Sequence, residues 1–291
     1  MMTTQTVLTS LLTSLTFTVA LNSWASPNDQ APTSREPMQS SQVLPLWEMG
    51  IATGAGYVPD YPGSDRSRAR AAVLPIVIYR GPLLRIENGS IYGRIKQTSN
   101  WELDLSANGA FNANNNADRQ GMPDLDYLFG LGPQLIYRGW QDQPGSPTLR
   151  MKLRAIMSTD LQRIDPRGTN FEPELQWRMA HVAGTPATLS LSIQPGWGSQ
   201  SLQSYLYQVN TEEATAARPA FTARAGYMGT EAGLTLTHKL QPDLSWFATA
   251  RFLSLHGSAN RHSPLLRDTS NFSIGAGVVW TPWRSSETAS K

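Results

Sequence analysis

The stretch from Asn271 to Trp283 reads NFSIGAGVVWTPW, and its alternation decides the fold. Every second position is apolar or aromatic, and the positions between are mostly small or polar: Phe272, Ile274, Ala276, Val278 and Trp280 against Ser273, Gly275, Gly277 and Thr281. Successive side chains of a β-strand face opposite sides of the sheet. A strand of about ten residues with one apolar face, one polar face and a terminal aromatic is typical of an outer-membrane barrel. The stretch therefore predicts an all-β transmembrane protein.

The same alternation recurs along the chain, in segments separated by clusters of Gly, Pro, Asn and Asp, and no segment shows a helical period. The clearest examples are Trp101 to Phe111, Leu125 to Tyr137, Leu149 to Met157, Phe171 to Met179 and Ala187 to Trp197, with shorter ones such as Phe221 to Tyr227. No run after the N-terminus approaches the roughly 18 apolar residues of a membrane-spanning helix. A protein of this kind that crosses a membrane must do so as a barrel.

The predicted number of strands depends on two segments whose structure is ambiguous. It is twelve if Leu83 to Ile95 forms one strand, and fourteen if Asn88-Gly89 is a hairpin turn and Ser204 to Val209 is also a strand. Bacterial single-chain barrels have an even number of strands and periplasmic termini. We therefore predict a closed antiparallel barrel of about 12–14 strands with both termini in the periplasm.

The N-terminal sequence has the features of an export signal. Val7 to Leu21 is apolar and spotted with Thr and Ser, and Ser23-Trp24-Ala25 fits a small-x-small cleavage site. The predicted division is a signal peptide at 1–25, a disordered periplasmic lead-in rich in Pro, Ser and Gln at 26–45, the barrel at 46–283 and a tail at 284–291.

Composition argues against several functions. The 24 basic and 22 acidic residues leave a net charge of +2, so a nucleic-acid partner is not expected. The chain has no cysteine, which excludes disulfides and thiolate chemistry. Its four histidines, at 181, 238, 256 and 262, lack metal-binding spacing, so no metal site is expected, nor any cofactor. An outer-membrane hydrolase would need a Ser/His/carboxylate set, and His238 could supply its histidine, but nothing nearby in the sequence nominates a serine, so no catalytic site is expected. We interpret His238 as a residue of the membrane interface.

One group of charged residues invites a functional interpretation. Arg150, Lys152, Arg154, Glu172, Glu174 and Arg178 alternate with apolar residues on two adjacent segments. A hairpin turning near Ile164 would place Arg154 opposite Glu174. The favoured interpretation is a salt-bridge network that fills a narrow lumen. The alternative is a charged constriction that selects solutes in a channel.

Three blocks carry a resemblance to a known family: GAGYVPDYPGSDRSR (Gly54 to Arg68), SQSLQSYLYQVN (Ser199 to Asn210) and ANRHSPLLRDTSNFSIGAGVVW (Ala259 to Trp280). With these blocks the chain resembles the MipA/OmpV family of Gram-negative outer-membrane proteins over nearly its whole mature length. The most specific pieces are the loops Tyr61-Pro62-Gly63-Ser64-Asp65 and Ser263-Pro264-Leu265. One departure is that eleven residues follow Trp280, where the family usually ends close to an aromatic. We interpret Tyr61 to Asp65 as a structural turn in preference to a binding site.

The resemblance implies an outer-membrane location and a scaffolding role without enzymatic activity. The name-giving member links the murein lytic transglycosylase MltA to a bifunctional penicillin-binding protein. The expected partners are thus outer-membrane lipid, a lytic transglycosylase and a penicillin-binding protein. A porin-like small-solute channel is the main alternative. A soluble periplasmic β-sandwich would fit the export signal but not the repeated apolar faces.

Overall fold

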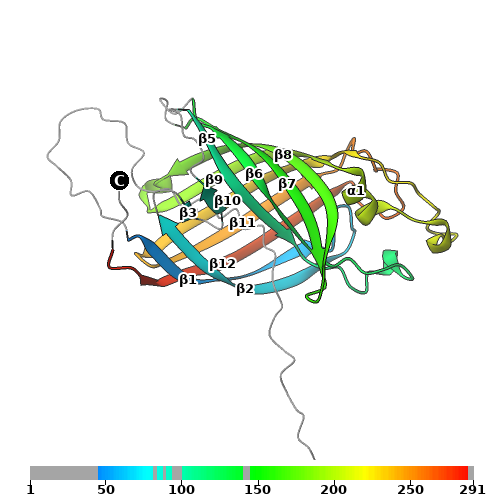
Figure 1. Cartoon of the computed structure of the whole chain (residues 1–291), viewed down its shortest axis with the longest axis horizontal. Coiled ribbons are helices and arrows are strands. Elements are labelled where there is room, and N and C mark those ends of the chain that lie inside the picture. Colours follow the sequence, from blue (N-terminus) through cyan, green and yellow to red (C-terminus); the bar gives the residue numbers. More distant parts are fainter. Residues whose placement is uncertain (1–44, 81–83, 88–89, 94–99, 140–144, 288–291) are drawn as a thin grey trace, which may run out of the picture.

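The computed structural model describes residues 45–287 except 81–83, 88–89, 94–99 and 140–144. Within this part of the chain, twelve strands form one sheet in the order β4-β3-β2-β1-β12-β11-β10-β9-β8-β7-β6-β5. Every pair of neighbouring strands is antiparallel. Figure 1 shows that the sheet is strongly curled. Its two edge strands in this order, β4 and β5, come round toward each other. The predicted all-β antiparallel fold is confirmed.

The strands fall into two length classes. Ten have 10 to 17 residues: β1 (Trp47–Pro59), β2 (Ser67–Arg80), β5 (Trp101–Ala110), β6 (Tyr127–Tyr137), β7 (Thr148–Thr159), β8 (Ile164–Ala180), β9 (Ala187–Gly198), β10 (Gly226–Gln241), β11 (Leu244–Ser254) and β12 (Ser270–Arg284). A short hairpin adds β3 (Leu84–Glu87) and β4 (Ser90–Gly93). The helices are α1 (Gln200–Tyr207) and the short 3-10 turns η1 (Ala117–Arg119), η2 (Val182–Gly184) and η3 (Thr211–Glu213).

Two elements differ from the sequence-based predictions. Residues 204–207, part of the optional strand Ser204 to Val209, belong to helix α1, so the prediction of no helix was wrong. This helix buries Leu202 and Leu206, one turn apart, a pattern too short to stand out in a long window. Leu125 and Phe221 also lie outside the named strands, in isolated bridges to Ala113 and Val209. Hence the predicted strand Phe221 to Tyr227 is wrong except for Gly226 and Tyr227, which begin β10, and Leu125 is 3% exposed instead of facing outward.

The closure of the barrel and the position of its termini stay predictions. Strands β4 and β5 stand at the two ends of the sheet order, and the residues that connect them, 94–99, lie outside the described part. The β3–β4 pairing, with Glu87 opposite Ser90, agrees with a hairpin at Asn88-Gly89, although the turn itself is not described. The predicted signal peptide, residues 26–44 and the last four residues also lie outside the description. No helix among the described residues is long and apolar enough to span a bilayer.

The outer face of the sheet is apolar. In β12, Phe272, Ile274 and Val278 are 58%, 49% and 37% exposed. The other strands carry the same outward apolar series: Met49, Ile51, Val73, Val77, Leu131, Leu153, Phe171, Ile193, Leu234 and Phe252. The buried residues of the inner face include many polar ones, such as Ser106, Ser190, Thr235 and Ser245. Apolar residues outside and polar residues inside reverse the rule for soluble proteins and fit a lipid-facing surface.

The two ends of the curled sheet are built differently (Figure 1). At one end, here the turn end, Pro242 and Asp243 alone connect β10 to β11, and the two ends of the described chain meet, because Leu46 N–H donates to Glu287 O at 2.8 Å. At the other end, here the loop end, lie the segments 60–66, 111–126, 199–225 and 255–269. Helix α1 belongs to this loop end.

Candidate functional site

Charged residues of β7 and β8 form a buried network on the inner face. Lys152 Nζ lies 2.7 Å from Glu174 Oε2, and Arg150 Nη1 lies 3.8 Å from the same oxygen. Arg154 forms an ion pair with Glu172, whose other oxygen accepts a 2.8 Å hydrogen bond from Asn170 Nδ2. The Lys152 and Glu174 side chains are only 6% and 5% exposed. A buried charge needs a partner, and each of these has one.

The pairing within this network differs from the predicted register. Arg154 stands opposite Asn170, while Arg150 stands opposite Glu174 and Lys152 opposite Glu172. The predicted apposition of Arg154 and Glu174 was therefore wrong. The turn covers residues 160–163, where Asp160 Oδ1 accepts hydrogen bonds from the N–H groups of Gln162 and Arg163. An Asp that bonds its own turn starts the reversal earlier than Ile164. The observed pairing differs from the predicted one by an even number of residues, so the charged side chains stay on the inner face of the sheet.

Uncharged neighbours extend the network over five strands. Ser106 of β5 accepts hydrogen bonds from Arg154 Nε and Nη2 at 2.9 and 2.7 Å, and Lys152 Nζ donates to Gln194 Oε1 of β9 at 2.7 Å. Gln134 of β6 donates to Asp104 of β5. Arg178 follows on the same face of β8, opposite Ser190. The charge network predicted from the sequence did not include Ser106, Gln134 and Gln194. Their positions in the alternating pattern, which place them on the inner face, could have identified them.

The loops of the family motif meet at the loop end. Gly63, with φ +87°, donates its N–H to Asn271 Oδ1 at 2.6 Å, and Asn271 Nδ2 donates to Ser64 O at 2.9 Å. Tyr61 Oη donates to Leu265 O at 2.8 Å. Tyr207 links the two loops, because its Oη donates a hydrogen bond to Pro62 O and its carbonyl oxygen accepts one from Ser263 Oγ. Asp65 is exposed, and Pro264 is half-buried.

These loops share an apolar core with helix α1 and β7. We call the packed assembly the loop cap and define it by its buried members Tyr61, Ala113, Leu125, Ile156, Leu202, Leu206, Tyr207, Ala223, Leu255 and Leu266. Such a core is unusual for long loops, which are ordinarily exposed and mobile. The loop cap is thus a folded structure in its own right.

Asp118 joins three loops of the cap. Its carboxylate lies 3.7 Å from Arg66 Nε and 3.4 Å from Arg267 Nε, and its carbonyl oxygen accepts a 2.8 Å hydrogen bond from Arg218. Burial raises the pKa of Asp118, the nearby carboxylate of Asp65 raises it further, and the two guanidiniums of Arg66 and Arg267 oppose the rise.

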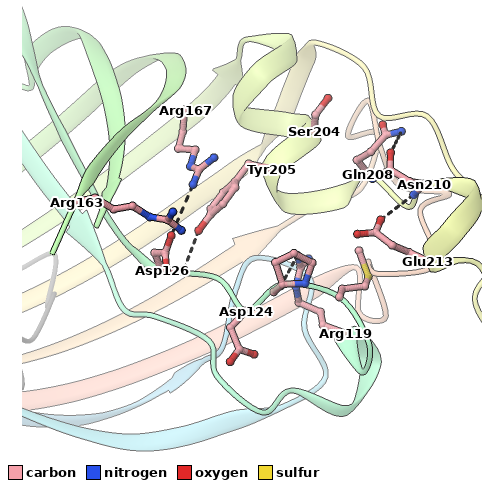
Figure 2. A pocket seen from close by; sticks show the side chains of 12 residues that line it. Arg119, Asp124, Asp126, Arg163, Arg167, Ser204, Tyr205, Gln208, Asn210 and Glu213 are labelled. Carbon is pink, nitrogen blue, oxygen red and sulfur yellow. Dashed lines mark hydrogen bonds and ion pairs between the residues drawn. The ribbon is translucent and has the colours of Figure 1, made fainter. Parts of the chain in front are cut away.

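A polar pocket of about 470 Å³ opens between the loop cap and the β7–β8 hairpin. Figure 2 shows two walls facing each other, with Arg163, Arg167 and Asp126 on one side and Gln208, Asn210 and Glu213 on the other. Arg167 stacks on the ring of Tyr205, its guanidinium carbon 4.3 Å from the ring centroid. The full lining is Arg119, Met122, Pro123, Asp124, Asp126, Arg163, Arg167, Ser204, Tyr205, Gln208, Asn210 and Glu213.

The histidines do not come together. Among residues 45–287 as far as they are described, no group of three His, Asp or Glu side chains is placed to hold a metal ion. His238 stacks on Trp246, with ring centroids 5.8 Å apart. Both residues lie near the turn end of β10 and β11, where aromatic side chains form the interfacial girdle of membrane barrels.

Comparisons with known proteins were made at the level of family and of structure. A family model described as MltA-interacting protein MipA matches residues 51–282. No curated protein sequence matches the chain. A NanC porin structure aligns with 79% of this chain and 99% of its own at 12% identity and a TM-score of 0.39. A Pseudomonas aeruginosa FadL homologue aligns with 81% of this chain and 90% of its own, at 8% identity and a TM-score of 0.30.

Proposed function

Because the chain belongs to the MipA family, we propose that it is a non-enzymatic outer-membrane scaffold that anchors murein-modifying enzymes. The family description names an interaction with MltA, and the family match is the observation that carries the proposal. The partners are a lytic transglycosylase and a penicillin-binding protein, held at the periplasmic side of the membrane. No site residue acts as a catalyst in this proposal.

The outer-membrane location is supported by the outward apolar series and the polar inner face. We propose that β4 and β5 close the sheet into a barrel, because an open edge within lipid would leave backbone groups without hydrogen bonds. The termini then lie in the periplasm, with the loop end outside the cell. A cleaved signal peptide at 1–25, a lead-in at 26–45, a barrel at 46–283 and a tail at 284–291 complete the proposed organisation.

Two structural features favour a scaffold over the alternative of a small-solute channel. The network of Arg150, Lys152, Arg154, Glu172 and Glu174 is internally paired, as in a structural plug. The long loops of the loop cap pack around a shared apolar core. A channel filter, in contrast, presents charges to passing ions.

The partner interface is proposed at the turn end. A barrel offers the periplasm only its short turns and the segment 26–45, whose composition suits ordering on a partner surface. The test is capture of a purified MltA-type lytic transglycosylase and a penicillin-binding protein by the full-length chain and by a variant lacking Pro27 to Pro45.

Full-length protein should retain both enzymes, and the deletion should weaken capture while leaving barrel assembly intact. Unchanged capture would move the interface to the turns. Failure of both proteins to capture either enzyme would refute the scaffold. Planar bilayers provide the parallel assay, since single-channel currents altered by Glu174→Gln would favour the channel instead.

A further inference from the structure

The pocket at the loop end has the features of a small-molecule site that the scaffold function leaves unused. Its volume of about 470 Å³ falls within the roughly 300–1,000 Å³ usual for such sites. Most sites of this size are lined mainly by apolar side chains. Ten of the twelve residues that line this pocket are polar or charged, which points to a ligand with polar groups. We propose that it binds a neutral saccharide ring.

Charge balance argues for a neutral ligand. The lining holds three arginines, Arg119, Arg163 and Arg167, and three carboxylates, Asp124, Asp126 and Glu213. Several are already committed within the protein: Arg167 Nη2 lies 3.6 Å from Asp126 Oδ2, and Glu213 Oε2 accepts a 2.9 Å hydrogen bond from Asn210 N–H. An anion or a polycation would find no net complementary charge in this pocket.

The other polar side chains of the lining suit a ligand with hydroxyl groups, because a hydroxyl both donates and accepts hydrogen bonds. Ser204 supplies a hydroxyl and Asn210 a carboxamide from one wall. Gln208 on the same wall is already engaged, because its Oε1 accepts a 2.9 Å hydrogen bond from Ala223 N–H and its Nε2 donates to Asn210 Oδ1 at 3.4 Å. Asp124 also lines the pocket, and one of its carboxylate oxygens accepts a 3.1 Å hydrogen bond from Asn115 N–H. Planar side chains with paired donors and acceptors match neighbouring hydroxyls on a ring.

The lining also includes the apolar side chains of Met122 and Pro123 and the ring of Tyr205, one face of which is covered by Arg167. A sugar ring carries C–H groups on its faces and hydroxyls on its rim, so a lining with both apolar and polar groups is complementary to it. Amphipathic aromatic residues such as Tyr are suited to this contact. Inorganic phosphate has no C–H face and would leave the apolar groups of the lining unused.

The walls are held in place before any ligand binds. Arg119, which is 6% exposed, donates to Leu206 O of α1 at 3.1 Å and to Pro123 O at 3.3 Å. Tyr205 Oη accepts a 2.7 Å hydrogen bond from Asp126 N–H, which joins α1 to the start of β6. A site whose parts are already ordered loses less entropy on binding.

The test uses full-length protein in a polyoxyethylene detergent, because glucoside or maltoside detergents would themselves compete. Methyl glycosides of glucose, galactose, mannose and N-acetylglucosamine are offered in saturation-transfer NMR, with inorganic phosphate and a neutral dipeptide as competitors. Intact lipopolysaccharide in nanodiscs and its released core oligosaccharide form two further arms, which distinguish a membrane-linked saccharide from a free one. Capture of a murein enzyme is measured on the same samples, so the scaffold function is judged separately.

Ser204→Trp places an indole in the pocket, and Ser201→Trp, on an exposed position of the same helix, is the matched control. We expect at least one saccharide probe to bind the wild type, and Ser204→Trp to weaken it about tenfold or more, the equivalent of roughly one lost pocket contact. Ser201→Trp should bind normally. Asp124→Ala, a smaller change at an exposed residue, should weaken binding if Ser204→Trp misfolds. Absence of binding by every saccharide, undiminished binding in both pocket variants, or selective binding of phosphate or dipeptide would overturn the proposal.

Discussion

Removing the charge of Glu174 should expose how strongly the inner network stabilises the protein. Its carboxylate lies 2.7 Å from Lys152 Nζ, and both side chains are almost fully buried. Glu174→Gln keeps the shape of the side chain but replaces the carboxylate beside the Lys152 ammonium by a neutral carboxamide, like that of Gln194, whose Oε1 accepts from Lys152 Nζ at 2.7 Å. The same change takes the carboxylate away from Arg150.

The magnitude follows from the geometry. At 2.7 Å and an effective dielectric constant of about 20, the gross attraction between Lys152 and Glu174 is roughly 6 kcal/mol. Desolvation of both ions offsets much of it, so the pair adds little net stability. Breaking it from one side is costly, because an unpaired charge stays buried. We expect Glu174→Gln to lower the free energy of unfolding by about 3–5 kcal/mol.

The assay is urea unfolding in lipid vesicles, followed by tryptophan fluorescence and by the difference in gel migration between boiled and unboiled samples. The double variant Lys152→Met with Glu174→Gln removes both charges and should recover about 1–3 kcal/mol relative to the single variant. The matched control is Glu231→Gln, whose partner Arg251 lies 3.5 Å away and whose side chain is 32% exposed. That control should cost about 0–1 kcal/mol. Losses that add in the double variant, or equal losses at Glu174 and Glu231, would refute a buried structural pair.

Three further perturbations test other parts of the molecule. Leu191→Arg, on the outer face of β9, should cost about 2–4 kcal/mol in vesicles, whereas Ser192→Arg on the inner face should cost far less; equal costs would mean that the faces are misassigned. Asn271→Ala leaves Gly63 N–H without its acceptor and should lower stability by about 1–3 kcal/mol, with faster proteolysis of the loop end than in the control Asn114→Ala; identical digestion would contradict the described contacts. The pKa of Asp118 is raised above its usual 3.8 in the folded protein. Protonation of Asp118 therefore stabilises the loop cap at acidic pH, and this stabilisation is lost as the pH rises from about 4 through the folded pKa. Proteolysis of the loop end should therefore quicken over that range in the wild type but not in Asp118→Asn, and a pH response that survives the substitution would exclude Asp118 as its source.

The sequence predicted the faces of the strands better than their register. Parity is a property of the extended backbone, so Phe272 and Ser106 could be assigned to opposite faces without knowledge of their neighbours. Register depends on where each turn begins. The Asp160 turn placed Arg150, not Arg154, opposite Glu174, and a count along the chain could not reveal this.

The loop cap and the pocket were not predictable in the same way. Helix α1 has only eight residues, and its apolar contacts lie on loops far away in the sequence. The network of Ser106, Gln134 and Gln194 required the curled sheet to bring five strands to one surface. The family motifs marked Tyr61 to Asp65 and Ser263-Pro264 as special but did not indicate that they contact common partners.

The hydrogen bonds of the loop cap also order the events of folding. Tyr61 and Leu265 are 204 residues apart, and Gly63 and Asn271 are 208 apart, so the Gly63 bond cannot form before the start of β12 has reached the end of β1. Contacts of such separation form late, because closing the intervening chain is costly in entropy. These bonds therefore form late, and a chain truncated before Asn271 would leave Gly63 N–H and Ser64 O without these bonds at the loop end. An intact cap thus reports that the chain has been made at least as far as Asn271 and that the start of β12 lies beside the end of β1.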